Sequence, residues 1–436
     1  MTSKTDATEA FVWIWLPGET EPVVAGRLTQ DGDRLLFTYG ASYRDRKNAI
    51  PIYEPELPLQ RGTIAPKPGL TMPSCIRDGS PDAWGRRVII NRLTGAKPDA
   101  AGIPDISEIT YLLQSGSDRI GALDFQTSSK DYVPRLAAEA SFEELLEAAE
   151  RIEKGLPLTP ALDQALNHGT SIGGARPKAL IDGEDRKYIA KFSSSTDTHS
   201  VVKAEFIAMR LAAACGLHAA QVSITQAAGK DVLLIERFDR EQAAQGWTRR
   251  AMVSGLTMLG LDEMMARYAS YEDLAELIRH RFTDPDETLK ELYGRLCFNI
   301  LCGNTDDHAR NHAAFWDGKA LRLTPAYDIC PQNRAGGEAS QAMLIKGVAR
   351  ASTIATCLEA APDFHLTKDE AASLIETQIA TLAETWQSVC DEAALSPVDQ
   401  KLFAGRQFLN PYCVEGLEGH GALKDAFDVG RSVMVG

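Results

Sequence analysis

The sequence predicts an α+β protein with a strand-rich N-terminal part and a helical C-terminal part. Short aromatic and β-branched runs, separated by turn residues, occupy the first hundred residues and are typical of strands. Beyond about residue 255, capping signals and apolar residues at helical spacing predominate. With 436 residues, 44% of them hydrophobic, the chain can bury a large core, and we expect it to divide into domains.

Three strands and a helix are expected near the N-terminus. The strands span Phe11–Leu16, Val23–Leu28 and Arg34–Tyr39. The pair Asp31-Gly32 predicts a hairpin turn before the third strand. Ser80 suits an N-cap, Pro81 the first helical position and Asp82 the positive end of the helix dipole, so a helix should begin there and run towards Leu93.

The rest of the chain alternates strands and helices before becoming helical. The expected elements are an amphipathic helix between about Pro134 and Leu156, strands Lys178–Ile181, Lys187–Phe192 and Val232–Ile235, and an apolar helix Val201–Cys215. Asp182-Gly183 should join the first two of these strands. Ser270 with Asp273, and Thr367 with Glu370, have the spacing of capping boxes that begin two later helices.

Composition narrows the class of protein. No run of about eighteen apolar residues is present, and the N-terminus lacks a basic region followed by an apolar segment, so neither a membrane span nor a secretory signal is expected. Eight scattered cysteines without a Cys-x-x-Cys pair favour reduced thiols in the cytoplasm. The net charge of −14 argues against non-specific binding of nucleic acid by the chain as a whole.

The most informative pattern is Asn304-Thr-Asp-Asp-His-Ala-Arg-Asn311, followed downstream by Asp328. Asp306 precedes Asn311 by five positions, as the catalytic aspartate precedes the metal-binding asparagine in protein-kinase loops. Phosphoryl transfer needs a base or positioning group for the attacking hydroxyl and hard oxygen ligands for magnesium. We therefore expect Asp306 to be catalytic, and Asn311 and Asp328 to bind Mg²⁺.

Upstream, the loop 169–178 has the sequence Gly-Thr-Ser-Ile-Gly-Gly-Ala-Arg-Pro-Lys. Glycines allow backbone amides to approach phosphate oxygens closely, so the loop could cover a nucleotide. It follows neither the Gly-x-Gly-x-x-Gly nor the Walker A pattern. Taken alone, a plain connecting loop is the better interpretation.

Lys191 ends an expected strand, and alternation puts it on the same face as Ile189, where its ammonium group could hold the α and β phosphates. Glu205, on the following helix, could pair with it. The alternatives are a strand-edge lysine in solvent and a glutamate at the solvent boundary of an apolar helix. Glu236 to Phe238 follow an apolar strand where an adenine-binding hinge would lie, and a charged strand exit is the alternative.

His308 lies two residues after Asp306. It could donate to a phosphate, or it could fix the loop by bonding a backbone carbonyl, and we favour the second role. The spacing of His308 and His312 is that of a helical metal pair, but no further ligand pattern surrounds them, so a zinc site is not expected.

The order of these weak signals carries more weight than any one of them. A glycine loop, a strand lysine, a helix glutamate, a hinge, Asp-x4-Asn and a final aspartate follow one another as in a two-lobed kinase. The chain also resembles the HipA family of bacterial toxin serine/threonine kinases. The residues that carry this resemblance are Ser171–Lys178, Ile189–Lys191, Glu236–Arg240, Asn304–Asn311, Tyr327-Asp328 and, nearer the N-terminus, Gly79–Arg87.

The resemblance implies a two-lobed protein-kinase-like fold with an extra N-terminal subdomain and an all-helical C-terminal lobe. We expect a β-rich subdomain at 1–130, a kinase N-lobe-like part at 131–245 and a helical lobe at 246–436. The family uses ATP and Mg²⁺. The nucleotide-binding residues that the resemblance implies are Ser171, Gly173, Gly174, Ala175, Lys191, Glu236, Phe238, His308, Asn311 and Asp328.

The resemblance also implies regulation and partners. Ser171 matches a serine that is autophosphorylated in the family, with Thr170 as the neighbouring candidate. Family members often phosphorylate an aminoacyl-tRNA synthetase and are neutralised by a small helix-turn-helix antitoxin, so DNA would be bound only through that partner. Two other functions stay open: a kinase-fold binding module that acts mainly as a co-repressor, and a magnesium-dependent hydrolase or small-molecule phosphotransferase using the same carboxylates.

Overall fold

The computed structural model describes residues 7–95, 106–136, 140–159, 161–162, 174–194, 197, 199–334 and 336–435. The chain forms two compact units. The first comprises Met1–Thr196, Thr225–Val253 and Phe315–Lys319, and the second comprises Asp197–Ile224, Ser254–Ala314 and Ala320–Gly436. Each unit therefore combines separate chain segments, and the domain limits proposed from the sequence stay predictions. In the described part of the chain, no helix combines the length and apolar character needed to cross a membrane.

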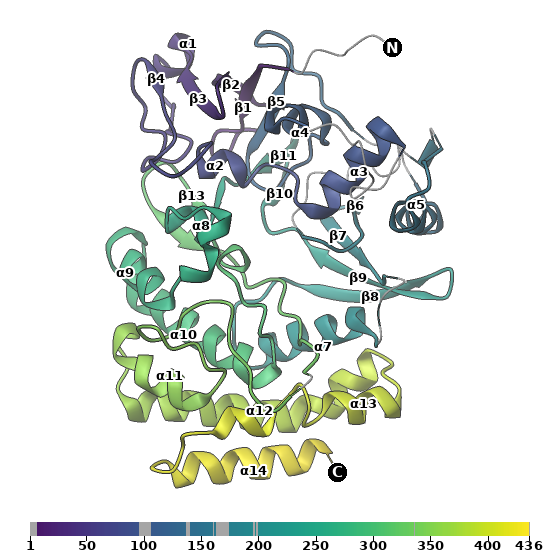
Figure 1. Ribbon diagram of the computed structural model, residues 1–436, viewed down its shortest axis with the longest axis vertical. Helices are drawn as coiled ribbons and strands as arrows, with labels where there is room; N and C mark the ends of the chain where they lie inside the picture. The colour runs from purple at the N-terminus through teal and green to yellow at the C-terminus, as the bar shows by residue number, and fades with distance from the viewer. Residues whose placement is uncertain are drawn as a thin grey trace. The chain divides into compact units, whose positions relative to one another are not determined.

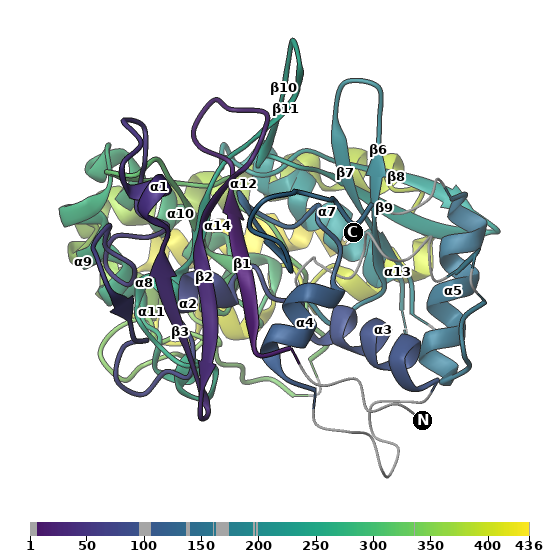
Figure 2. The same cartoon turned by 90° about the horizontal axis from the view of Figure 1, so that it is seen from above.

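A five-stranded antiparallel sheet of order β4-β3-β2-β1-β5 forms part of the first unit, and its strands β3, β2 and β1 lie side by side in Figure 2. Its strands are β1 (Glu9–Ile14), β2 (Val23–Asp31), β3 (Arg34–Tyr39), β4 (Thr63–Ile64) and β5 (Leu123–Gln126). Alternate residues of β3 are buried, as expected for a strand with one face on a core. Asp31 pairs with Arg34, and Gly32 has a φ of 61°, so the predicted hairpin is confirmed.

Short helices follow this hairpin: α1 (Ala41–Arg44), α2 (Ser74–Arg77), α3 (Ala83–Thr94) and α4 (Glu108–Gln114). The predicted start of α3 is wrong by two residues, because Asp82 and not Ser80 is its N-cap. The Ser80 hydroxyl donates to Glu108 at 3.3 Å, and the Asp82 carboxylate accepts the Gly174 amide at 2.8 Å. Contacts with distant residues thus replace the expected local cap.

A four-stranded sheet of order β6-β7-β9-β8 also belongs to the first unit (Figure 1). It contains β6 (Lys178–Asp182), β7 (Lys187–Phe192), β8 (Val222–Ala227) and β9 (Lys230–Glu236). The three strands predicted here, which correspond to β6, β7 and β9, are confirmed, whereas β8 was not predicted. Helices α3 and α5 (Phe142–Lys154) share one hydrophobic cluster with this sheet. The cluster includes Trp84, Val88, Leu145, Leu146, Ile152, Phe192 and Val232.

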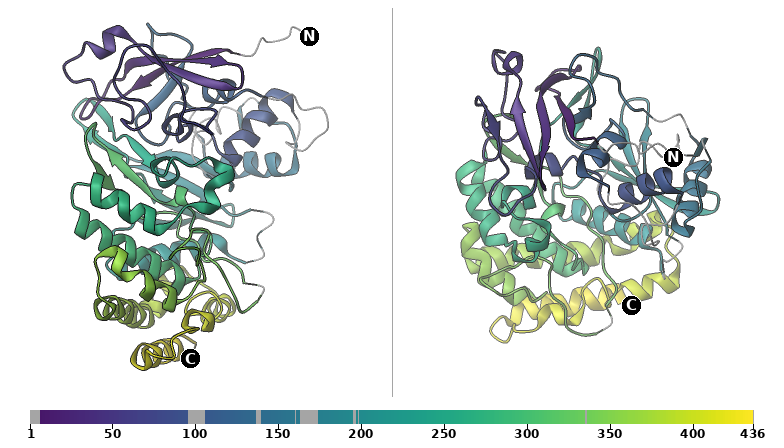
Figure 3. Two further views of the ribbon diagram at one scale, coloured as in Figure 1. Left: turned by 60° about the vertical axis from the view of Figure 1, so that its left-hand side comes forward. Right: turned by 45° about the horizontal axis from the view of Figure 1, so that its top comes forward.

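The second unit is mainly helical. Its α-helices are α7 (Val201–Ala214), α8 (Gly255–Met258), α9 (Tyr271–Arg281), α10 (Pro285–Cys302), α11 (Ile354–Ala360), α12 (Lys368–Glu392), α13 (Pro397–Phe403) and α14 (Gly421–Val435). The 3₁₀ helices are η2 (Glu263–Tyr268), η3 (Ala309–Asn311), η4 (Ala361–Phe364) and η5 (Pro411–Val414). The long helix α12 packs against α7, α10 and α14, and the yellow-green α12 and yellow α14 run side by side (Figure 3).

The predicted helix starts at Ser270 and Thr367 are confirmed. Both hydroxyls accept the amide three residues later, and Thr367 and Glu370 form a complete capping box. The expectation of an all-helical C-terminal part needs correction, because β12 (Met252–Ser254), β13 (Ala313–Trp316) and β14 (Leu321–Leu323) form a three-stranded sheet. These strands are too short to show a period in the sequence. A second hairpin joins β10 (Arg240–Ala243) to β11 (Gly246–Arg249).

Candidate active site

The loop that carries Asp306 begins where α10 ends. Gly303 terminates the helix with a φ of 75°, and a Cβ there would lie 2.5 Å from the Gln407 carbonyl oxygen, so only glycine fits. Asn304 is buried; its Nδ2 donates to Asn299 Oδ1 at 3.0 Å, and its carbonyl accepts from Gln341 Nε2 at 2.9 Å. These contacts hold the chain in place just before Asp306.

The structure brings Asp306 and Asn311 together. The Asp306 carbonyl accepts the His308 amide at 2.9 Å and the Asn311 Nδ2 at 3.1 Å. Because the amide nitrogen of Asn311 points at this carbonyl, its Oδ1 points away from it and can serve as a ligand for a hard cation. The Asp306 side chain itself is exposed, as a group that meets a substrate hydroxyl must be.

Asp328 lies near enough to influence Asp306 electrostatically. Partial burial raises the pKa of Asp306 above its ordinary value, the negative charges of Asp328 and Asp307 raise it further, and His308 opposes them. Asp328 has a φ of 58°, a left-handed conformation that aspartate tolerates better than most residues. Asn311 Oδ1 and the Asp328 carboxylate are hard oxygen donors of the kind that Mg²⁺ prefers, and their role as its ligands stays a prediction.

A buried anchor beneath this loop was missed by the sequence analysis. Asp307 is 1% exposed, and its Oδ1 lies 2.8 Å from His312 Nε2. The Tyr271 hydroxyl donates to the other Asp307 oxygen and also lies 3.3 Å from His312 Nε2. Burial, and then Asp307, raise the pKa of Tyr271 well above its ordinary value, so this hydroxyl keeps its proton. The sequence around Asp307 and His312 contains no local pattern that indicates this buried contact.

His308 does not share a helical face with His312. It has an extended backbone, with φ −91° and ψ 163°, so the interval of four does not place the two rings on one side of a helix. Its Nδ1 is buried and has no hydrogen-bond partner among the residues that the structure describes. Within the same residues, no three His, Cys, Asp or Glu side chains form a group that could hold a metal ion. The phosphate and loop-fixing roles of His308 both stay predictions.

The first unit carries the expected nucleotide-binding segments. Thr170, Ser171 and Gly173 lie outside the described residues, whereas Gly174 and Ala175 lie within them. The Gly174 amide donates to Asp82 at 2.8 Å, its carbonyl accepts the Trp84 amide at 3.1 Å, and the Ala175 carbonyl accepts from Arg87. The N-terminal end of α3 therefore holds the end of the glycine loop.

A second lysine beside Lys191 was also missed. Lys191 and Lys178 are directly paired across β7 and β6, which places both side chains on the same face of the sheet. They are 9% and 3% exposed, and a Cβ on Gly174 would lie 2.2 Å from the Lys178 Nζ. The register of this hairpin could have revealed the pair. Glu205 is buried on α7 in the second unit, so its pairing with Lys191 stays a prediction.

The expected hinge follows β9. The Arg237 amide donates to the Lys187 carbonyl at 2.8 Å, which commits this amide to the sheet. The adenine-binding role of the Glu236 to Phe238 backbone stays a prediction. The Phe238 ring meets Phe315 edge to face at 5.9 Å. The Arg237 side chain forms buried ion pairs with Asp118 and Asp239. The sequence alone could not reveal the ion pair with Asp118, because Asp118 lies more than a hundred residues before Arg237 in the chain.

The helices and antiparallel sheets together form an α+β, protein-kinase-like fold. The HipA-like C-terminal domain model matches residues 170–386, and the HipA N-terminal domain model matches residues 15–126. The chain belongs to the HipA family.

Individual relatives agree with this assignment. The chain is 27% identical over 350 residues to a Sinorhizobium fredii protein named "Putative kinase Y4mE", covering 72% of this chain and 76% of the relative. It is 26% identical over 183 residues to the serine/threonine-protein kinase toxin HipA of Shewanella oneidensis, covering 36% and 42%. HipA from the S. oneidensis HipA, HipB and operator DNA complex has the same fold, with a TM-score of 0.65, 19% identity and coverage of 97% and 96%.

Proposed function

We propose that this protein is an ATP-dependent serine/threonine protein kinase that acts as the toxin of a toxin–antitoxin pair. The observation that carries the proposal is the return of Asn311 to the Asp306 carbonyl, with Asp328 close enough to raise the pKa of Asp306. A base, an amide oxygen and a second carboxylate are the groups that phosphoryl transfer requires. Membership of the HipA family, whose named relatives include kinases, supports the same reaction class.

Each residue has a defined part in this mechanism. Asp306 orients the substrate hydroxyl and accepts its proton, and its raised pKa makes it a better acceptor than an ordinary carboxylate. Asn311 Oδ1 and the Asp328 carboxylate would hold Mg²⁺, which, when bound, neutralises charge on the phosphates. Lys191 and Lys178 would contact phosphate oxygens, and the backbone of Glu236 and Phe238 would meet adenine.

The remaining parts of the proposal come from the family. Ser171 would be autophosphorylated, which would add a dianion where ATP phosphates must lie. The protein substrate would be an aminoacyl-tRNA synthetase, and a small helix-turn-helix antitoxin would neutralise the toxin and contact DNA. The S. oneidensis complex, whose name includes HipA, HipB and operator DNA, supports an antitoxin partner of this kind.

A lysate phosphorylation assay with γ-labelled ATP tests the reaction class. Wild type should label one or a few protein bands, and Asp306→Asn should label none, because the amide cannot accept the proton. Asp317→Asn, which changes an exposed aspartate outside this loop, should label the same bands as wild type. Equal labelling by Asp306→Asn and wild type would exclude Asp306 as the catalytic residue.

Expression in bacterial cells tests the toxin role separately. Wild type should arrest growth, and Asp306→Asn should relieve the arrest. Arrest that persists in the variant would favour the alternative binding module, which acts through partners without phosphoryl transfer.

A further inference from the structure

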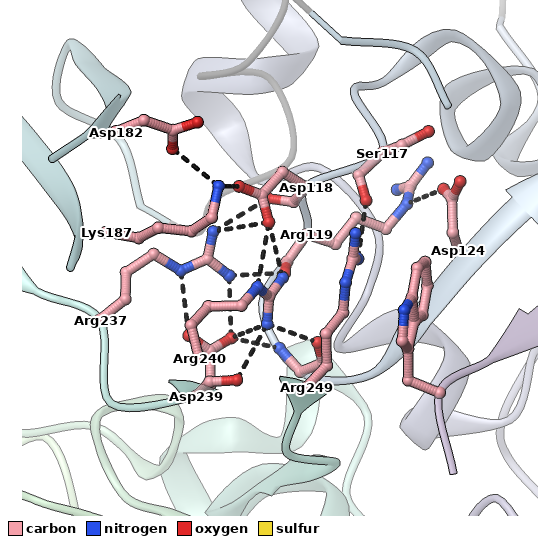
Figure 4. Close-up of polar contacts among 12 residues, drawn as sticks. Ser117, Asp118, Arg119, Asp124, Asp182, Lys187, Arg237, Asp239, Arg240 and Arg249 are labelled. Carbon is pink, nitrogen blue, oxygen red and sulfur yellow. Dashed lines mark hydrogen bonds and ion pairs between the residues drawn. The ribbon is translucent and has the colours of Figure 1, made fainter. Parts of the chain in front are cut away.

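A buried cluster of charges surrounds the segment that follows β9 (Figure 4). Asp118 lies in the loop before β5, and Arg237, Asp239 and Arg240 lie at the hinge; all four are at most 5% exposed. One Asp118 oxygen lies 3.0 Å from Arg237 Nη1 and 2.8 Å from Arg240 Nη2. One Asp239 oxygen lies 2.9 Å from each of the same two guanidinium groups. Each of the two carboxylates therefore pairs with both guanidinium groups.

The same side chains also bind the backbone of the loop that carries Asp118. Arg237 Nη2 donates to the Arg119 carbonyl at 2.8 Å, and Arg240 Nη1 donates to the Gly121 carbonyl at 2.9 Å. In return, the Gly121 amide donates to Asp239 at 2.7 Å. Each segment thus satisfies polar groups of the other, and neither can shift without leaving a buried group unpaired.

The two segments come from different parts of the family architecture. Residues 118–121 fall in the match to the HipA N-terminal domain, and residues 237–240 fall in the match to the HipA-like C-terminal domain. Both belong to the first compact unit. Through this cluster, the segment 118–121 of the N-terminal subdomain binds the segment 237–240 at the hinge.

The side chains of this cluster are charged, and their hydrogen bonds have a fixed geometry. Burial alone would raise the pKa of Asp118, but Arg237, Arg240, Arg249 and Lys187 lower it well below its ordinary value. Burying charges has a desolvation cost that rivals the Coulombic gain, so such pairs are a poor way to add stability. Guanidinium forks, however, fix distance and angle, which apolar contacts do not. The cluster is suited to setting the orientation of the hinge.

Asp118 also reaches the strand next to the hinge. Its second oxygen lies 3.5 Å from the Nζ of Lys187, whose carbonyl accepts the Arg237 amide. Asp118 therefore fixes Arg237 in two ways. It pairs directly with the Arg237 side chain, and it contacts Lys187, which binds the Arg237 backbone amide. Because Glu236 and Phe238 are joined to Arg237 by peptide bonds, a fixed Arg237 also restricts the orientation of their backbone groups.

We propose that Asp118 is a positioning residue for adenine selection, holding the hinge backbone in the one orientation that distinguishes adenine from guanine. Adenine presents an acceptor next to an amino donor, and guanine presents the opposite order at the corresponding edge. A hinge with a fixed orientation leaves unpaired polar groups against guanine, whereas a loosened hinge accepts both bases. This inference rests on the proposed function, since it requires that the hinge binds ATP.

Nucleotide binding by the full-length chain tests this role. Calorimetry with non-hydrolysable ATP and GTP analogues should show a clear preference for ATP in wild type. Asp118→Asn, which keeps the shape and removes the charge, should reduce the ratio of ATP to GTP affinity by at least about tenfold. Hydrogen exchange at residues 236–238 should become faster. Arg240→Lys, which keeps the charge but loses the fork, should give the same changes and provides a second, milder variant.

Two control variants separate positioning from general destabilisation. Asp124→Asn removes an equally buried carboxylate of the N-terminal subdomain, which pairs with Arg119 and Arg135. Arg186→Gln removes the exposed partner of the Glu236 side chain. Both should keep the wild-type ratio of ATP to GTP affinity, because neither touches Asp118, Arg237 or Arg240 in the ion pairs described above.

The possible outcomes distinguish this inference from the proposed function. A wild-type chain that binds no ATP would overturn the proposed function and this inference with it. A selective wild type together with selective Asp118→Asn and Arg240→Lys variants would overturn only the inference. An equal loss of selectivity in Asp124→Asn, or failure of both hinge-cluster variants to fold, would assign the cluster a structural role and overturn the inference as well.

Discussion

The Asp307 carboxylate lies 2.8 Å from His312 Nε2 in the buried base of the loop that presents Asp306 and Asn311. Tyr271, which begins α9, donates to the same carboxylate, and its ring meets the His312 ring edge to face at 5.4 Å. Asp307 is the second residue of the Asp306–Asn311 turn, and His312 follows its last residue. Their contact therefore ties the ends of the loop together beneath the exposed Asp306.

Replacing Asp307 with alanine should reduce the free energy of unfolding by about 3 kcal/mol, because the Tyr271 hydroxyl and the His312 ring lose a shared buried partner. Urea unfolding followed by tryptophan fluorescence measures the change. Glu418→Ala removes an exposed carboxylate and should cost less than about 0.5 kcal/mol. Indistinguishable unfolding curves for these two variants would contradict the anchoring role.

Replacing Asp306 with asparagine should stabilise the protein at pH 7 while abolishing phosphoryl transfer. The pKa of Asp306 is raised by burial and by its acidic neighbours, so the folded state binds its proton more tightly than the unfolded state. The charged carboxylate therefore lowers stability as pH rises through the interval between the unfolded and the folded pKa. The variant's advantage in unfolding midpoint should be present at pH 7 and disappear below about pH 4. An Asp306→Asn variant less stable than wild type at pH 7 would contradict this electrostatic account.

Asp328→Asn should keep the fold but demand more magnesium. Asparagine tolerates the left-handed backbone at φ 58°, so the melting temperature should stay near that of wild type. Loss of one anionic ligand should raise the Mg²⁺ concentration needed for half-maximal rate, measured by steady-state kinetics at saturating ATP. Removal of the charge should also move the acid limb of the pH–rate profile to lower pH, because Asp328 helps to raise the pKa of Asp306. An unchanged Mg²⁺ requirement would exclude Asp328 as a ligand.

Gly255→Ala should displace the segment 309–312, which contains the end of the catalytic loop and packs against Gly255. The Gly255 amide donates to the His312 carbonyl at 2.6 Å, and a Cβ there would lie 2.5 Å from the Ala309 carbonyl oxygen. Overpacking of this kind costs about 1–3 kcal/mol, and it should also reduce kcat, since η3 carries Asn311. Gly419→Ala adds a methyl group in open space and serves as the control. Thermal unfolding and kcat that match in the two variants would argue against close packing at Gly255.

Lys178→Met should weaken ATP binding about tenfold, equivalent to roughly 1.4 kcal/mol, because one of two ammonium groups on the same face of the sheet is lost. Calorimetric titration with a non-hydrolysable ATP analogue measures the affinity. Lys230→Met removes a lysine of the same sheet that pairs with Glu150 at the surface, and it should bind as wild type does. Equal affinities of Lys178→Met and wild type would leave Lys191 as the sole phosphate-binding candidate of this hairpin.

Local signals predicted most of the secondary structure. Strand β3 and strand β7 match their predicted bounds because turn residues, Asp31-Gly32 and Asp182-Gly183, define their ends. The start of α3 was misplaced because Ser80 bonds Glu108, a residue that no local pattern connects to it. The strands β13 and β14 were missed because so few residues cannot display a period.

The interval between Asp306 and Asn311, and the alternation that ends at Lys191, are properties of the sequence alone, because loop geometry and strand alternation depend on neighbours along the chain. The buried partners of the site depend on tertiary structure. Tyr271 meets Asp307 across 36 positions, and Arg240 meets Asp118 across 122. Residue pairs separated by so many positions produce no periodic pattern in the sequence. Only folding brings them within hydrogen-bonding distance, where burial makes their pairing decisive for the shape of the loop and of the hinge.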